Sequence, residues 1–127
     1  MAKAKPTRKK PQRGVSYAQV VQLGRELPEV EESTSYGTPA LKVRGKLLVR
    51  LKEDGKTLVL RATFEERERL LAAAPYVFYL TDHYLNYPAV LVRLPLIERE
   101  FMRELLAEAW RSVAPQKLVK GATKPAS

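Results

Sequence analysis

The chain has 127 residues, no cysteine and a formal net charge of +9. This length allows one small domain, and the lack of cysteine excludes disulfides and thiolate chemistry. No apolar run reaches the ~20 residues that cross a bilayer, and no apolar stretch follows the basic N-terminus as it would in a signal peptide. We therefore expect a cytoplasmic protein without a membrane partner.

The net charge lies at the two ends of the chain. Residues 1–14 carry six Lys and Arg, residues 115–127 carry three Lys, and neither segment contains an acid. Because such segments bury too little apolar surface to offset their chain entropy, we expect disordered basic arms at 1–14 and 116–127 around a domain at 15–115. Basic arms favour a polyanionic partner, and Arg8, Lys9 and Lys10 are candidate contacts to nucleic acid. Such arms would also suit a solubilising role or an anionic lipid surface.

Local signals predict the secondary structure in chain order. Ser16 and Gln19 form a capping-box pattern that begins a helix, which Pro28 ends. Six strands are then expected from alternation and from turns at Gly37, Gly45 and Gly55, at 31–36, 40–43, 46–51, 57–61, 76–80 and 89–93. Thr63 and Glu66 form a second capping box and begin a short helix between the fourth and fifth strands. Its residues expected to point inward are Phe64, Leu70, Leu71 and Ala74.

A third helix is expected after Pro95, as far as about Ala114. Its apolar residues recur at steps of four, with Leu106 and Trp110 beside them: Ile97, Phe101, Leu105, Ala109 and Val113. Trp110 is expected in the core. The element order is therefore αββββαββα. Short antiparallel connections in this order imply an α+β fold with a single antiparallel sheet of about five to six strands and helices packed on one face.

Strand alternation divides the side chains of the sheet into two faces. The side chains expected to face the helices are Leu41, Val43, Leu47, Val49, Leu51, Leu58, Leu60, Val90 and Val92. The opposite face would then carry Lys42, Arg44, Lys46, Arg50, Lys52, Arg61 and Arg93. Such a basic face could follow a phosphate backbone, although Lys and Arg are also ordinary on solvated sheet faces.

Aromatic residues are predicted to gather near the same face. Tyr36, His83, Tyr84 and Tyr87 could meet at one mouth of the sheet, where they would stack on unpaired bases or line a pocket. One histidine without cysteine does not make a zinc site, and no nucleophile, base and acid set can be assembled. We therefore expect no metal, no cofactor and no enzymatic activity.

Several separated motifs resemble the MmcQ/YjbR family of small bacterial proteins. They are Leu27-Pro28-Glu29-Val30-Glu31-Glu32, Ser35-Tyr36-Gly37-Thr38-Pro39-Ala40-Leu41-Lys42-Val43, Gly45-Lys46, His83-Tyr84, Tyr87-Pro88 leading into Val90-Leu91-Val92-Arg93-Leu94, and Ala109-Trp110. The resemblance covers about residues 16–115. It implies a compact domain similar to the frataxin-like (CyaY-like) fold, also described as a double wing, whose members are commonly labelled DNA-binding. It brings no catalytic residue with it.

These observations predict a non-enzymatic nucleic-acid-binding module, monomeric, with DNA favoured over RNA. Its basic arms would supply non-specific affinity, and the basic sheet face with its tyrosines would supply a preference for shape or for single strands. The alternative is a small-molecule or protein-interaction domain in which the Tyr and His residues line a pocket.

Overall fold

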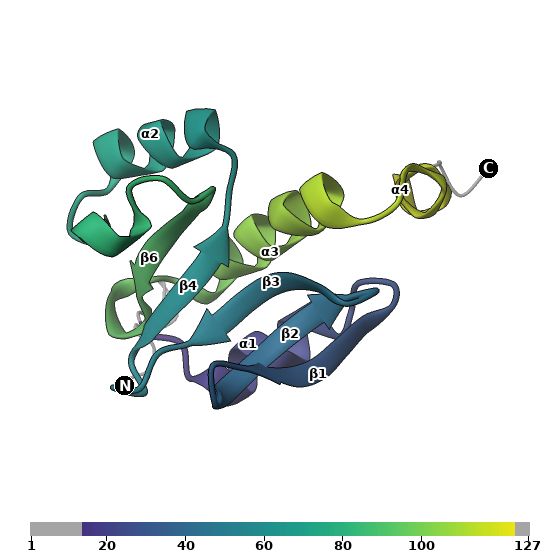
Figure 1. Ribbon diagram of the computed structural model, residues 1–127, viewed down its shortest axis with the longest axis horizontal. Helices are drawn as coiled ribbons and strands as arrows, with labels where there is room; N and C mark the ends of the chain where they lie inside the picture. Colours follow the sequence, from purple (N-terminus) through teal and green to yellow (C-terminus); the bar gives the residue numbers. More distant parts are fainter. Residues whose placement is uncertain (1–13, 124–127) are drawn as a thin grey trace, which may run out of the picture.

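The protein is described here by a computed structural model, which covers residues 14–123. One sheet of six antiparallel strands runs through the molecule in the order β1-β2-β3-β4-β6-β5. In Figure 1, β1, β2, β3, β4 and β6 can be followed in this order. The strands are β1 (Val30–Ser35), β2 (Thr38–Val43), β3 (Lys46–Leu51), β4 (Thr57–Arg61), β5 (Phe78–Tyr79) and β6 (Ala89–Arg93). The first four strands form a meander, and β6 then pairs with β4, so that β5 becomes the far edge.

Helices cover one face and one end of this sheet. They are α1 (Tyr17–Gly24), α2 (Phe64–Ala73), η2 (Asp82–Tyr84), η3 (Leu94–Leu96), α3 (Arg99–Val113) and α4 (Gln116–Thr123). In Figure 1, α1 and α3 lie behind the sheet, whereas α2 lies across the end at which β4 finishes. The predicted α+β class with one antiparallel sheet is confirmed, and the element order agrees as far as α3. Leu70 and Leu71 of α2 pack against the same core as α1 and α3.

Both predicted capping boxes are present. The Ser16 hydroxyl accepts the Gln19 backbone N–H at 3.1 Å, and the Gln19 side chain accepts the Ser16 N–H at 3.0 Å. Thr63 and Glu66 make the same reciprocal pair at the start of α2. In each case two backbone donors that the helix leaves without partners are satisfied, so the sequence pattern alone sets where the helix begins.

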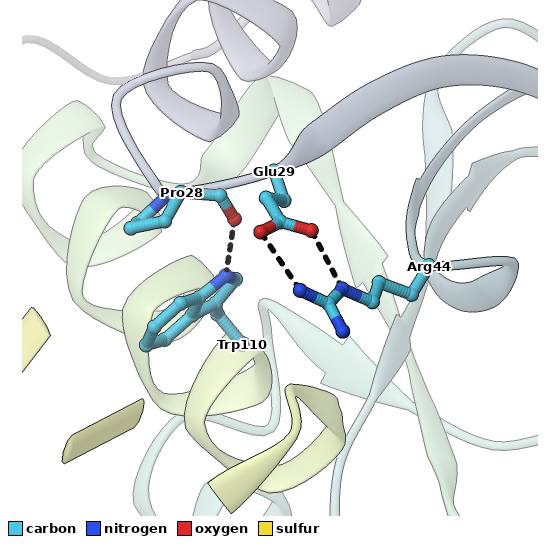
Figure 2. A network of polar contacts seen from close by, with 4 residues as sticks. All are labelled: Pro28, Glu29, Arg44 and Trp110. Carbon is cyan, nitrogen blue, oxygen red and sulfur yellow. Dashed lines mark hydrogen bonds and ion pairs between the residues drawn. The ribbon is translucent and has the colours of Figure 1, made fainter. Parts of the chain in front are cut away.

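The main core lies between the sheet and the two covering helices. Leu41, Leu58 and Val90 of the sheet and Leu106 of α3 are fully buried there. Trp110 is also in this core, and its indole N–H donates to the Pro28 carbonyl at 2.9 Å (Figure 2). The prediction that Trp110 is a core residue is therefore confirmed, and its hydrogen bond connects α3 to the chain just before β1.

A β-bulge changes the predicted facing of β3. Leu41 lies opposite Val49, but the next pair is Lys42 with Leu47, so Leu48 is the extra residue on β3. Leu48 is fully buried in the core, and Leu47 instead lies with Lys42 on the other face. The prediction that Leu47 faces the helices is wrong, because a bulge shifts the alternation by one residue.

The second helix also differs from its expected facing. Phe64 is exposed, and the buried residue of α2 is Arg67. Leu70 and Leu71 are partly buried against the core, as expected.

The chain ends differ from the expected disordered arms where the structure describes them. Residues 116–123 form α4, whose Leu118 and Val119 pack against the core, so this stretch is a helix and not a tail without structure. Residues 1–13 and 124–127, with the predicted contacts Arg8, Lys9 and Lys10, lie outside the described residues. Between residues 14 and 123, no helix is long and apolar enough to span a bilayer.

Candidate functional site

The sheet face opposite α1 and α3, called the open face here, contains a pocket of about 400 Å³. It is lined by residues from the β1–β2 turn, β3, the β3–β4 turn, β4, the segment between β5 and β6, and the start of β6. They are Tyr36, Leu47, Arg50, Glu53, Val59, Arg61, His83, Tyr84, Tyr87, Pro88 and Ala89. All four aromatic residues that the sequence analysis grouped together line this open-face pocket, together with Arg50 and Arg61 from the predicted basic face.

Three of the aromatic rings form one wall. The His83 and Tyr84 ring centroids are 4.7 Å apart and nearly perpendicular, and Tyr87 lies 5.8 Å from His83 and 6.3 Å from Tyr84. Tyr84 also packs against a small apolar cluster on the open face, formed by Val59 and its neighbours. Tyr87 is 54% exposed, so this wall offers aromatic surface to a ligand.

The position of this wall depends on Arg67, which sequence reasoning did not single out. Its Nη1 donates to the backbone carbonyls of Tyr84, Tyr87 and Ala89 at 3.1, 2.8 and 3.4 Å, and its Nη2 donates to that of Leu85 at 3.1 Å. The side chain is 6% exposed. A sequence signal for its burial existed, because Arg67 lies three and four residues before Leu70 and Leu71, which pack against the core.

Arg50 is the most buried cation of the pocket. Its residue is 7% exposed, its Nη1 donates to the Thr38 hydroxyl at 2.8 Å, and the same nitrogen lies 3.6 Å from the Glu53 carboxylate. Its guanidinium carbon lies 5.4 Å from the centroid of the Tyr36 ring. These contacts hold the guanidinium in one place, whereas an exposed Arg samples many rotamers.

Other cations of the open face lie beside tyrosine rings. Lys52 Nζ lies 5.6 Å from the centroid of Tyr84, and the Arg93 guanidinium lies 4.1 Å from that of Tyr79. Lys42 belongs to the same face because it pairs with Leu47, which lines the pocket. The face thus alternates cationic and aromatic groups.

Two residues of the predicted basic face lie elsewhere. Arg44 makes a two-pronged ion pair with Glu29, with Nε and Nη2 at 2.6 and 3.0 Å from the carboxylate oxygens, next to Pro28 and Trp110 (Figure 2). The hydrogen bonds from Arg44 lower the pKa of the Glu29 carboxyl below its usual value. Lys46 lies opposite Val43, a core residue, and does not line the pocket. Alternation misplaced Arg44 because it lies in the turn between β2 and β3, and Lys46 because the bulge at Leu48 shifts the facing of β3 by one residue.

Acidic groups are few but not absent on this face. Glu31 lies opposite Lys42, and Glu53 lies beside Arg50 at the pocket. Among residues 14–123, His, Cys, Asp and Glu side chains form no cluster of three or more that could hold a metal ion. The arrangement is suited to non-covalent binding: flat aromatic surfaces accept a planar group, and the guanidinium groups beside them accept an anion.

Comparisons with known proteins agree with the predicted family. The YjbR family model matches residues 25–112. Three uncharacterized proteins, one from Mycobacterium bovis and two from Mycobacterium tuberculosis, are each 49% identical to this chain over 51 residues, which is 40% of this chain and 40% of theirs. The similarity therefore spans less than half of the relatives' own length.

A solved structure shares the fold. The crystal structure of a Deinococcus radiodurans protein with a DUF419 domain has a TM-score of 0.66 to this protein, at 23% identity over 80% of each chain. Since the family model extends from the end of α1 almost to the end of α3, the whole sheet and its main covering helix are included. The chain belongs to the YjbR family.

Proposed function

We propose that this protein is a non-enzymatic nucleic-acid-binding module that holds an unpaired nucleotide of a DNA strand in the open-face pocket. The observation that carries the proposal is the convergence of four aromatic side chains with Arg50 and Arg61 around one pocket. A nucleotide has a flat base and an anionic phosphate, and the pocket offers both complements within one cavity. Each base stacked on an aromatic side chain contributes about 1 to 3 kcal/mol to binding.

The surroundings of the pocket suit a strand that continues beyond one nucleotide. Lys42, Lys52 and Arg93 extend the cationic surface along the open face, so neighbouring phosphates find partners on either side of the pocket. Contacts of this kind position the backbone without reading the sequence. The basic arms predicted from the sequence add a further contribution to the affinity, which depends on the salt concentration and not on the nucleotide sequence. A monomeric protein located in the cytoplasm is part of this proposal, because nucleic acid is accessible there.

A second candidate function rests on the size of the pocket. A volume of about 400 Å³ lies within the range of small-molecule sites, roughly 300 to 1,000 Å³. In that case the ligand would be a free anionic molecule with a planar ring, and the open face around the pocket would contribute nothing to its affinity. The two candidates differ in whether affinity increases with the length of the strand.

The test is a fluorescence anisotropy titration of the full chain with a labelled single-stranded DNA of about 12 nucleotides, at two salt concentrations. RNA of the same sequence, the DNA duplex and a free mononucleotide serve as competitors. The variants are Tyr84→Ala and Arg61→Ala, with Arg69→Ala as the matched control because Arg69 is an exposed arginine of α2 outside the pocket.

We expect Tyr84→Ala to weaken single-strand binding by about 1 to 3 kcal/mol. Arg61→Ala should reduce the slope of log affinity against log salt by about 1, and Arg69→Ala should bind as the unchanged protein does. Every variant keeps the arms, so differences among them report on the pocket. Absence of single-strand binding at low salt would refute the proposal. If the mononucleotide competes as well as the oligonucleotide on a molar basis, the small-molecule function replaces it.

A further inference from the structure

The β1–β2 hairpin has an unusual residue at its turn. Tyr36 has φ of 54° and Gly37 has φ of 80°, so both central residues are in the left-handed region, as in a type I′ turn. That turn strongly prefers Asn-Gly, because a side chain other than Asn or Asp is disfavoured there by contact between Cβ and the carbonyl oxygen. A tyrosine at this position therefore lowers the stability of the turn relative to asparagine.

Within residues 14–123, the other non-glycine residues with positive φ have an evident structural reason. They are Glu29, with φ of 59°, and Arg44, with φ of 48°. Their side chains form the two-pronged ion pair described above, which joins the start of β1 to the β2–β3 turn (Figure 2). The strain at Glu29 and Arg44 is thus offset by a contact between them.

Tyr36 has no comparable structural contact. Its side chain is 88% exposed, so it adds nothing to the core. The Arg50 guanidinium lies over its ring, at 5.4 Å from the centroid, and Tyr36 lines the open-face pocket together with His83, Tyr84 and Tyr87. Strained residues that bring no packing gain are found preferentially where a ligand binds.

We propose that Tyr36 is a stacking residue of the pocket, kept at the hairpin turn for binding and at the expense of stability. This inference rests on the proposed function and specifies its ligand. The base of the bound nucleotide stacks on the Tyr36 ring, and the phosphate lies against the buried guanidinium of Arg50 beside it. The ligand must therefore carry an intact base, and a phosphate backbone alone does not use Tyr36.

The experiment compares Tyr36→Asn, which suits the turn and removes the ring, with Tyr36→Phe, which keeps both the ring and the strain. Each is titrated with the labelled single strand and with an abasic strand of the same length, and each is melted without ligand. Tyr76→Asn is the binding control, because Tyr76 is 59% exposed and lies outside the pocket. Arg44→Asn is the turn control, since it introduces Asn at the corresponding position of the β2–β3 turn but removes the ion pair to Glu29.

We expect Tyr36→Asn to bind the strand with bases about 5- to 100-fold more weakly, and the abasic strand unchanged. Tyr36→Phe should retain most of the affinity, and Tyr76→Asn all of it. Tyr36→Asn should melt about 2 to 5 °C above Tyr36→Phe, because relief of the turn exceeds the loss of one cation–π contact whose ring is exposed. Arg44→Asn should not melt above the unchanged protein.

The possible failures separate the two proposals. If the unchanged protein binds the strand and Tyr36→Asn binds it equally well, the inference on Tyr36 is overturned while the proposed function stands. Equal losses for the strand with bases and the abasic strand would also overturn it, since stacking would not be the cause. A lower melting temperature for Tyr36→Asn than for Tyr36→Phe would contradict the strain argument. No binding of either strand by the unchanged protein refutes the proposed function, and this inference with it.

Discussion

Replacing Arg67 by methionine tests how the aromatic wall of the pocket is held. Methionine keeps most of the aliphatic length of arginine and removes all four hydrogen bonds from its guanidinium, three to backbone carbonyls of the segment between β5 and β6 and one to the carbonyl of Ala89 at the start of β6. It also removes the stacking of the guanidinium on the Phe64 ring, whose centroid is 4.7 Å away. No ion pair involves Arg67 within the described residues, so the change leaves no acid without its partner.

The size of the effect follows from the exposure of the carbonyls. Each hydrogen bond from a charged donor is worth about 1.5 to 3 kcal/mol, so four would exceed the stability of many small domains. Leu85 and Tyr87 are exposed, however, so water can replace the donors lost at their carbonyls, whereas Ala89 is buried. We therefore expect Arg67→Met to lower the free energy of unfolding by about 2 to 4 kcal/mol.

The assay combines urea unfolding with native-state hydrogen exchange. The amides of Tyr84, Leu85 and Tyr87 should exchange faster in Arg67→Met, whereas those of β4 should change only through the lower global stability. Single-strand binding should weaken because the wall of the pocket is no longer held in place. Arg69→Met on the same helix is the control, since Arg69 is exposed, and it should leave both measurements unchanged. Unchanged stability and unchanged exchange in Arg67→Met would refute this account.

Three further changes test the fold and its pH dependence. Hydrogen bonds from the backbone N–H of Lys56, and next from the Thr57 hydroxyl, lower the pKa of the Asp54 carboxyl. The carboxylate therefore stabilises the fold above pH of about 4, and this stabilisation is lost as the pH falls through the lowered pKa. Asp54→Asn should be less stable than the unchanged protein at pH 7, and the urea unfolding curves of the two proteins should coincide near pH 2. Burial raises the pKa of Tyr17 to about 12, so stability present below pH of about 10 should decline as the pH rises toward 12, and Tyr17→Phe should remove that decline in alkaline melts. Leu105→Ala should lower the free energy of unfolding by about 2 to 3 kcal/mol. The loss should be smaller than for Leu106→Ala, because Leu105 is 8% exposed and Leu106 is fully buried. Equal melting temperatures for Leu105→Ala and the unchanged protein would contradict the packing of α3.

Features set by short-range contacts could be read from the sequence. The helix starts at Ser16 and Thr63 were predicted because a capping box involves residues three apart. The turns at Gly37, Gly45 and Gly55 were predicted because their left-handed backbone selects glycine. Strand boundaries followed from these turns, and the α+β class followed from the order of the elements.

The sequence predicted only in outline which residues line the pocket. Tyr36 and the residues between β5 and β6 were expected at one mouth of the sheet, and the structure brings them to one pocket. Their mutual geometry depends on Arg67, whose role was not predicted because its partners are backbone carbonyls distant in the sequence. Such carbonyls carry no signature in the residue types.

The sequence by itself determined the element order, the capping boxes, the glycine turns and the alternation that assigned Arg50 and Arg61 to one face, since each depends on neighbours within a few residues. Only the tertiary structure decided that a bulge turns Leu47 toward the pocket, that the chain continues as α4, and that Arg67 rather than Phe64 is buried. These outcomes depend on which surfaces meet after the chain has folded. Burial and register are properties of the assembled core, and a local pattern specifies them only when no bulge or long-range hydrogen bond intervenes.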